Sequence, residues 1–185
     1  MKNKLGTEKR ELEYYKPDNL IRSIKRSAKQ HGFNGFFGVL YYTIKKNIDW
    51  LFSIIAYFAP FTGIRIFFHR LKGVKIGKRA FIGYQCVLDE VFPDFIEIGN
   101  DVSLAGGVWV LTHSTPYMHH SEMLKSFVAP VKIKDKAWIT INVTILPGVT
   151  IGEGSIITAG SVVNRDIPDW VIAGGNPAKV IKKLK

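Results

Sequence analysis

His113 is the residue whose type and position most suggest chemistry. It follows the strand-like run VWVLT and begins a polar loop, residues 113–130, that also contains His119 and His120. An imidazole can take up a proton near neutral pH, so His113 could act as a general base that removes a proton from an acceptor hydroxyl or amine. His119 and His120 could bind that acceptor or orient His113, or they could be solvated side chains of a surface loop.

Asp89 is the second candidate for a role in chemistry. It follows Leu88 in a shorter polar interruption, together with Glu90 and Asp94. Its carboxylate could accept hydrogen bonds from the hydroxyl groups of an acceptor, or it could bias the protonation of His113. A solvated acidic turn is the alternative interpretation.

The segments around these candidates follow a strict six-residue period. A helix repeats every 3.6 residues and a strand every two, so neither produces this pattern. A solenoid does, if each hexad forms one short strand and a corner, and the polar interruptions then project as loops. The aliphatic positions of the period are Ile76, Ile82, Leu88, Ile98, Leu104, Val110, Ile133, Ile139, Ile145, Ile151, Ile157 and Val163.

Residues 71–185 contain the stretches IGKRAFIG, IEIGNDVSLAGGV, ILPGVTIGEGSIITAGSVV and AGGNPAKVI. With these motifs the region resembles the hexapeptide-repeat acyltransferases. The resemblance implies a left-handed parallel β-helix, a homotrimer and acetyl-CoA as the acyl donor. It also implies that His113 is the general base and that Asp89 faces the acceptor.

The same resemblance indicates which residues bind the donor. It places Trp138 beside the acyl and pantetheine channel, where an aromatic face would exclude water. The residues it assigns to coenzyme A are Ala159, Asn164, Arg165, Lys179 and Lys182. Thr140 and Ile141 depart from the family pattern, which usually has Gly and then a small polar residue. No metal is expected, because no third histidine lies one or two coils upstream of the loop.

The charge of the chain is concentrated in its first part. Residues 1–79 hold 17 Lys and Arg against 5 Asp and Glu, whereas residues 80–185 hold 9 against 10. Such asymmetry indicates an anionic partner for the first part. Nucleic acid is not expected, because the aromatic residues of this region cluster with apolar ones, as they do in packing or lipid contact.

Residues 1–70 are predicted to form a basic, partly apolar helical arm. The run from Trp50 to Ile64 carries no formal charge, but it is short for a bilayer span and Pro60 interrupts it. It could lie on an anionic membrane surface, or it could cap a core or an oligomer interface. The opening twenty residues lack the apolar run of a secretory leader. We therefore expect a cytoplasmic protein, at the inner face of the cytoplasmic membrane if the arm binds lipid.

The fold predicted from these features is an all-β solenoid, a left-handed parallel β-helix. It has an N-terminal helical, amphipathic arm and a short C-terminal helix after a turn at Gly174 and Pro177. The predicted function is an acetyl-CoA-dependent O-acetyltransferase that acts by direct transfer on a sugar hydroxyl of a surface polysaccharide or lipid-linked glycan precursor. The alternatives are N-acetylation of a nucleotide-linked amino sugar, xenobiotic acetylation and a non-enzymatic β-helix scaffold.

Overall fold

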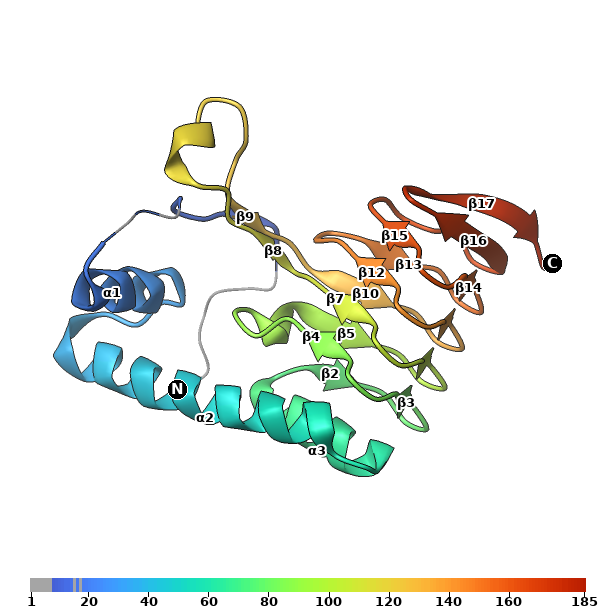
Figure 1. Ribbon diagram of the computed structural model, residues 1–185, viewed down its shortest axis with the longest axis horizontal. Coiled ribbons are helices and arrows are strands. Elements are labelled where there is room, and N and C mark those ends of the chain that lie inside the picture. The colour runs from blue at the N-terminus through green and yellow to red at the C-terminus, as the bar shows by residue number, and fades with distance from the viewer. Residues whose placement is uncertain (1–7, 15, 17) are drawn as a thin grey trace.

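The chain folds into a β-solenoid joined to three helices (Figure 1). A computed structural model describes residues 8–14, 16 and 18–185. Each coil gives one short strand to each of three parallel sheets, in the orders β13-β10-β5-β2, β16-β14-β11-β6-β3 and β15-β12-β7-β4. The strands of the solenoid are β2 (Lys75–Ile76), β3 (Phe81–Ile82), β4 (Val87–Leu88), β5 (Ile96–Ile98), β6 (Ser103–Leu104), β7 (Trp109–Val110), β10 (Val131–Ile133), β11 (Trp138–Ile139), β12 (Thr144–Ile145), β13 (Thr150–Ile151), β14 (Ile156–Ile157), β15 (Val162–Val163) and β16 (Val171–Gly175).

The aliphatic residues of the six-residue period fill the inside of the coil. Ile139 and Ile145, for example, have no exposed surface. Neighbouring coils stack in register, so that Ile145 of β12 lies between Val110 of β7 and Val163 of β15. Cys86 is also buried, as its place in the repeat predicts. The predicted solenoid is confirmed, and its core is a column of stacked aliphatic side chains.

The corners of the coil need glycine for two different reasons. At Gly77 a Cβ would lie 2.6 Å from the carbonyl carbon of Gly99 in the next coil, so only glycine permits the coils to approach this closely. At Gly148 the backbone has a φ of +84°, a left-handed conformation that disfavours most side chains. Asn142 adopts the same conformation at the preceding corner, where the φ is 56°.

The predicted C-terminal helix is wrong. Residues Ala178–Lys183 instead form a strand, β17, which pairs antiparallel with β16. The turn at Gly174 and Pro177 is therefore the connection of a β-hairpin. An open last coil exposes unpaired N–H and C=O groups, and pairing with β17 satisfies those of β16.

Three helices precede the solenoid: α1 (Leu20–Gln30), α2 (Gly35–Phe58) and α3 (Thr62–Lys72). The side chain of Asn19 caps α1 by accepting a hydrogen bond from the Arg22 N–H at 3.0 Å. Pro60 follows the end of α2, and Gly73 ends α3 in the left-handed conformation. Residues 1–7, 15 and 17 of the predicted arm lie outside the described residues.

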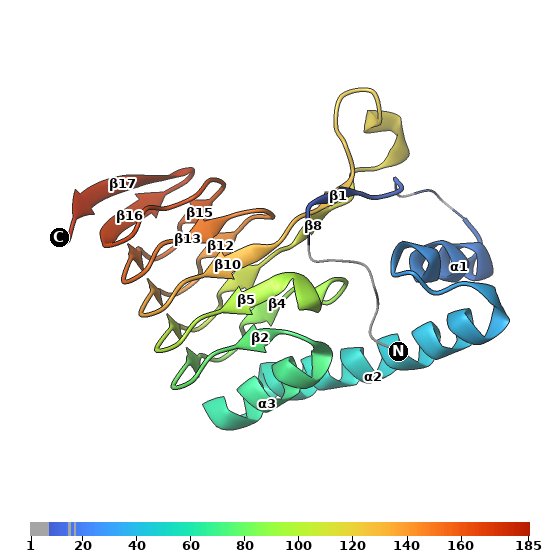
Figure 2. The same ribbon diagram turned by 180° about the vertical axis from the view of Figure 1, so that it is seen from behind.

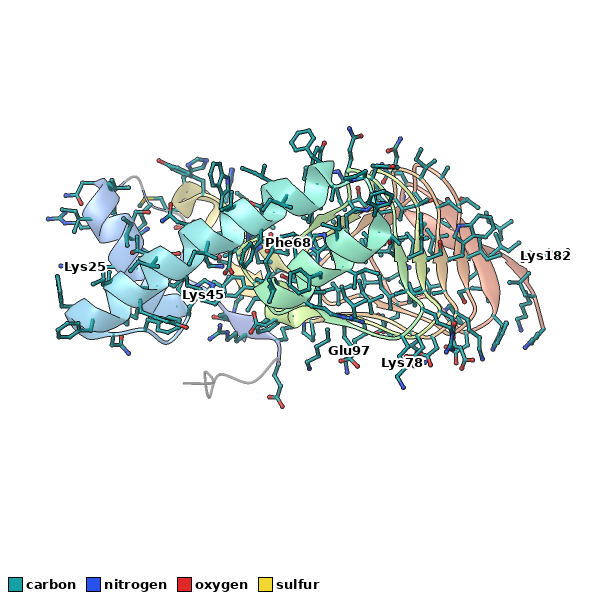
Figure 3. All side chains as sticks on the ribbon, turned by 90° about the horizontal axis from the view of Figure 1, so that it is seen from below. Lys25, Lys45, Phe68, Lys78, Glu97 and Lys182 are labelled. Carbon is teal, nitrogen blue, oxygen red and sulfur yellow. The ribbon has the colours of Figure 1, made fainter. Side chains whose placement is uncertain are left out.

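The arm lies across the first coils of the solenoid. α3 packs on β2 and β3, and α2 packs on α3 and continues to α1 (Figure 2). Seen from below, α2 and α3 run over the first coils, with Lys25 and Lys45 on the arm and Lys182 at the opposite end of the molecule (Figure 3). Within the described part of the chain, none of the helices is both long enough and apolar enough to cross a bilayer.

Both polar interruptions leave the coil as loops. The first contains a short 3-10 helix, η1 (Pro93–Phe95). The second forms a hairpin of β8 (His113–Ser114) and β9 (Phe127–Val128), with a second 3-10 helix, η2 (Met118–His120), in the projecting part (Figure 1). A strand of the N-terminal segment, β1 (Arg10–Glu11), pairs antiparallel with β9 and ties the arm to this hairpin.

Candidate active site

His113 and Asp89 form a hydrogen-bonded pair at one corner of two successive coils. Asp89 follows β4 and His113 lies just after β7, and these strands are paired in register. The Nδ1 atom of His113 lies 2.7 Å from Asp89 Oδ2. An ionised carboxylate can only accept, so Nδ1 carries the proton and Nε2 of a neutral ring keeps its lone pair. The pair therefore presents a base at Nε2.

Three backbone N–H groups fix the Asp89 carboxylate from behind. Oδ1 accepts from Val91 at 2.8 Å and Phe92 at 3.1 Å, and Oδ2 accepts from Thr112 at 2.8 Å. Burial alone would raise the pKa of this carboxyl, but the hydrogen bonds and the charge of His113 outweigh it and hold the pKa well below its usual range. Asp89 is thus ionised wherever the protein is folded near neutral pH. With its side chain 1% exposed, it faces His113, and of the two roles considered for it the geometry favours the one that acts on the histidine.

The helical arm holds the peptide groups that donate to Asp89. Lys46 of α2 donates from Nζ to the carbonyl oxygens of Glu90 at 2.9 Å and Val91 at 2.7 Å. A ring nitrogen of His31 lies 2.8 Å from the same Val91 oxygen. These two carbonyls belong to the peptide groups whose N–H donate to Asp89 Oδ1. Because linked hydrogen bonds polarise one another, these contacts from the arm strengthen the hydrogen bonds that the Val91 and Phe92 N–H groups donate to Asp89.

His113 faces a cavity of about 510 Å³ between the arm and the solenoid. This volume lies within the range of small-molecule sites, about 300–1,000 Å³. Its polar and charged lining comes from Ser53, His69, Lys72, Cys86, Asp89, Glu90 and His113. Its apolar lining includes Ile54, Tyr57 and Phe58 of α2 and Trp109 and Leu111 of the coil. The base therefore opens into a space that combines hydrogen-bonding groups with aromatic and aliphatic walls.

The structure brings some of the sequence-predicted site residues together and separates others. His113 and Asp89 meet, as described. His119 and His120 lie on η2, and their rings contact each other at a centroid distance of 4.2 Å. Neither of them lines the cavity at His113. Their predicted role in acceptor binding stays a prediction.

The predicted donor-binding residues lie on two faces of the solenoid, and none lines the cavity at His113. Half-exposed Trp138 is on β11, and exposed Ala159 follows β14 in the same sheet. The exposed side chains of Lys179 and Lys182 extend this face along β17. The remaining two, Asn164 and Arg165, are exposed after β15, which belongs to the sheet that leads to His113.

The chemistry of this set suits a phosphorylated thioester. Lysine, arginine and asparagine donate hydrogen bonds to phosphate oxygens, and an indole face can border an apolar chain. In one chain, however, the two faces do not meet around His113.

The sequence-based prediction missed the part of the cavity that the arm supplies. His69 and Lys72 are buried on α3. The sequence does contain a pattern that indicates their burial: together with Arg65 they stand at positions i, i+4 and i+7, which lie on one face of a helix. Trp109, Leu111 and His113 are spaced two residues apart. In an extended chain such residues point to the same face, so the spacing indicates that all three face the cavity. Nothing in the local sequence indicates that α2 packs beside these residues and completes the cavity.

Two family profiles match the repeats. The profile of the bacterial transferase hexapeptide (six repeats) matches residues 130–165, and that of the hexapeptide repeat of succinyl-transferase matches residues 73–112. A Bacillus subtilis protein provisionally named an acetyltransferase is 34% identical over 128 residues, which cover 69% of this chain and 71% of that relative. A Schizosaccharomyces pombe protein with the same provisional name is 42% identical over 114 residues, or 60% of this chain and 54% of that relative. The chain thus spans about half the length of the S. pombe protein.

Solved structures share the fold. A maltose O-acetyltransferase from Clostridium difficile has a TM-score of 0.60 at 26% identity, covering 93% of this chain and 92% of that one. A hexapeptide-repeat acetyltransferase from Vibrio cholerae, in complex with acetyl coenzyme A, has a TM-score of 0.60 at 23% identity, covering 78% and 90%. The relatives and the solved structures thus share one fold class, a β-solenoid built from hexapeptide repeats. The chain belongs to the hexapeptide-repeat acetyltransferase family, in which the coil is left-handed.

Proposed function

We propose that the protein is an acetyl-CoA-dependent O-acetyltransferase that acts on a sugar hydroxyl. The observation that carries the proposal is the His113–Asp89 pair at 2.7 Å, open to a cavity with hydrogen-bonding and aromatic walls. Hydroxyl groups can bind the polar atoms of such a cavity, while the C–H face of a sugar ring packs on aromatic side chains. The relatives named as acetyltransferases and the maltose O-acetyltransferase of similar fold support the same reaction.

The proposed chemistry takes place at Nε2 of His113. Bound acetyl-CoA supplies an acetyl thioester, and the acceptor hydroxyl supplies the nucleophile. As the hydroxyl oxygen attacks the carbonyl carbon, Nε2 takes its proton, and Asp89 stabilises the imidazolium that forms. The proton then passes to the departing thiolate, which leaves as coenzyme A. Direct transfer needs no enzyme nucleophile. Cys86 lines the cavity, but it is buried, and burial raises the pKa of its thiol.

The donor site is proposed to lie between two chains of a homotrimer. Asn164 and Arg165 would bind phosphates on one face, and Lys179 and Lys182 would do so on the other. Trp138 and the backbone at Ala159 would border the pantetheine arm. This arrangement explains why the set is split over two sheets of one chain.

The acceptor is proposed to belong to a surface polysaccharide or a lipid-linked glycan precursor. Support comes from an apolar stripe along the exposed side of α2. The stripe repeats at helical spacing and consists of Phe37, Tyr41, Ile44, Ile48, Leu51 and Phe58. An exposed apolar patch of this length, next to a strongly basic segment, fits the surface of an anionic membrane. We infer a location at the inner face of the cytoplasmic membrane.

Transfer is tested by incubating the full chain with acetyl-CoA and a panel of mono- and oligosaccharides. Coenzyme A release is followed with a thiol reagent, and the products are examined by mass spectrometry for an added acetyl group. We expect a sugar ester that hydroxylamine cleaves. A hydroxylamine-stable amide on amino sugars would instead indicate N-acetylation, and no turnover on any acceptor would favour a scaffold.

Lys46 should act as a positioning residue for the proposed base. Burial lowers the pKa of Lys46 to about 8. Replacing it by methionine keeps the side-chain length but removes the donors to Glu90 and Val91, so we expect kcat/KM to fall by about tenfold through misplacement of Asp89. Loss of the nearby positive charge should move the acid limb of the pH–rate profile to higher pH. Lys46→Arg should restore both rate and profile; an unchanged profile in Lys46→Met would contradict the role.

The apolar stripe should govern membrane binding. We expect the protein to float with vesicles that contain anionic phosphatidylglycerol, and to bind less in high salt. Changing Phe37 of the stripe and its exposed neighbour Phe36 to serine should lower the bound fraction more than about tenfold, because each phenylalanine loses its transfer into the interface. Phe81→Ser on β3 is the matched control and should float like the wild type. Equal flotation of all three proteins would refute the membrane proposal.

A further inference from the structure

The deepest wall of the active-site cavity contains buried polar groups without partners. His69 is only 2% exposed, and neither of its ring nitrogens has a hydrogen-bond partner within residues 8–14, 16 and 18–185. Burying such groups unpaired destabilises a protein, so they call for an explanation. Because His69 lines the same cavity as His113, a ligand in that cavity can supply the missing partners.

The state of His69 indicates the chemistry of those partners. Burial, with the charges of Lys72 and Arg65, lowers the pKa of His69 to about 3, so its ring is neutral. A neutral imidazole offers one donor and one acceptor, which matches hydroxyl groups, since each of them both donates and accepts. Lys72, one turn further on α3, donates to Ser53 Oγ at 2.6 Å and to the Leu88 carbonyl at 3.4 Å. Its ammonium group adds a further donor beside the ring.

The exposed rim of the cavity is mostly apolar. Phe58 lines the cavity and is 72% exposed, and Trp109 lines it and is 48% exposed. Ile54, one helical turn before Phe58, is also exposed at the rim. The cavity therefore has buried polar groups at its floor, and its exposed rim combines these three apolar side chains with the carboxylate of Glu90.

The apolar side chains of this rim are continuous with the apolar stripe of α2. Phe58 is the last residue of the stripe and also a wall of the cavity. Starting at Phe37, the stripe runs 21 residues along one helix, a rise of about 31 Å at 1.5 Å per residue. An apolar chain that leaves the cavity thus meets exposed apolar side chains in the direction of the arm.

We propose that the acceptor is an amphiphilic glycoside. Its hydroxylated ring binds His69 and Lys72 at the floor of the cavity, with one hydroxyl at His113, and its apolar aglycone lies across Ile54 and Phe58 onto the stripe. This inference rests on the proposed transfer to a sugar hydroxyl and adds the nature of the aglycone and the residues that select it.

The test compares octyl and methyl β-glycosides of glucose and of galactose. Binding is measured by calorimetry without acetyl-CoA, below the critical micelle concentration, and transfer is measured separately. We expect at least one octyl glycoside to bind about tenfold or more tightly than its methyl partner, the gain from burying two methylene groups. Phe58→Ser should abolish this preference by lowering the affinity for the octyl glycoside toward that for its methyl partner. Phe37→Ser, at the far end of the stripe, is the matched control and should keep the preference.

A second variant tests the floor of the cavity. His69→Phe removes two unpaired buried nitrogens, so the unliganded protein should melt at the same or a higher temperature, while affinity for both glycosides falls about tenfold or more. Equal affinity for octyl and methyl glycosides, absent binding of every octyl glycoside, or unaltered affinity in His69→Phe would overturn the inference. Acetyl transfer to sugars without an octyl preference overturns this inference alone. Octyl binding without any acetyl transfer overturns the proposed function, and what remains of this inference is the preference of the cavity for an amphiphilic glycoside.

Discussion

His113→Ala should lower kcat by about 10²–10⁴-fold, the usual contribution of a positioned general base. The ring accepts the proton at Nε2 and binds Asp89 through Nδ1, so its removal deletes the base and leaves the carboxylate without its main partner. The KM for acetyl-CoA should change little, because the cationic and amide groups proposed to bind its phosphates lie elsewhere on the solenoid. The measurement is initial-rate kinetics by coenzyme A release with the acceptor that the panel identifies.

Two controls make this result specific. Thr115→Ala changes an exposed residue of the same loop, two positions further on, and should leave the rate near that of the wild type. Circular dichroism and thermal melting should show that His113→Ala keeps its fold, since His113 lies at the corner of the coil and not in the aliphatic column. A His113→Ala protein that keeps more than a tenth of the wild-type kcat would show that another group takes the proton.

Much of the solenoid could be predicted because its signal is local and repeated. Each hexad places its aliphatic residue inside the coil by the same geometry, so the same local pattern recurs many times along the sequence. The pairing of Asp89 with His113 also follows from the repeat. Leu88 and Val110 stack in register, and Asp89 and His113 follow them by one and three positions, near the same corner of neighbouring coils.

The arm and its contribution to the cavity could not be predicted in this way. His69 lies 44 residues before His113, and no period relates the two. Their proximity depends on α3 packing against the first coils, which is decided by tertiary contacts that occur once in the chain. The end of the chain failed for a related reason. The sequence AKVIKK can form helix or strand, and the open edge of β16 decides in favour of β17.

Asp89→Asn should lower kcat by about 10²–10⁴-fold with little change in KM, although the new side chain has nearly the same shape. An asparagine can turn its NH₂ toward His113, and the ring must then accept at Nδ1 and carry its proton at Nε2, the tautomer that cannot act as a base. The lost negative charge also destabilises the imidazolium, so the acid limb of the pH–rate profile should move to lower pH. Lys46→Met removes a positive charge from the same network and should move it the other way.

This opposite movement separates an electrostatic role of Asp89 from a merely structural one. A variant that only loosened the loop would lower the rate without a directed change in the profile. Asp94→Asn makes the same chemical change on an exposed carboxylate of the same loop, and it should alter neither rate nor profile. If Asp89→Asn kept the wild-type kcat, or if the acid limb of its pH–rate profile moved to higher pH, Asp89 could not be the group that fixes the tautomer of His113 and stabilises its imidazolium.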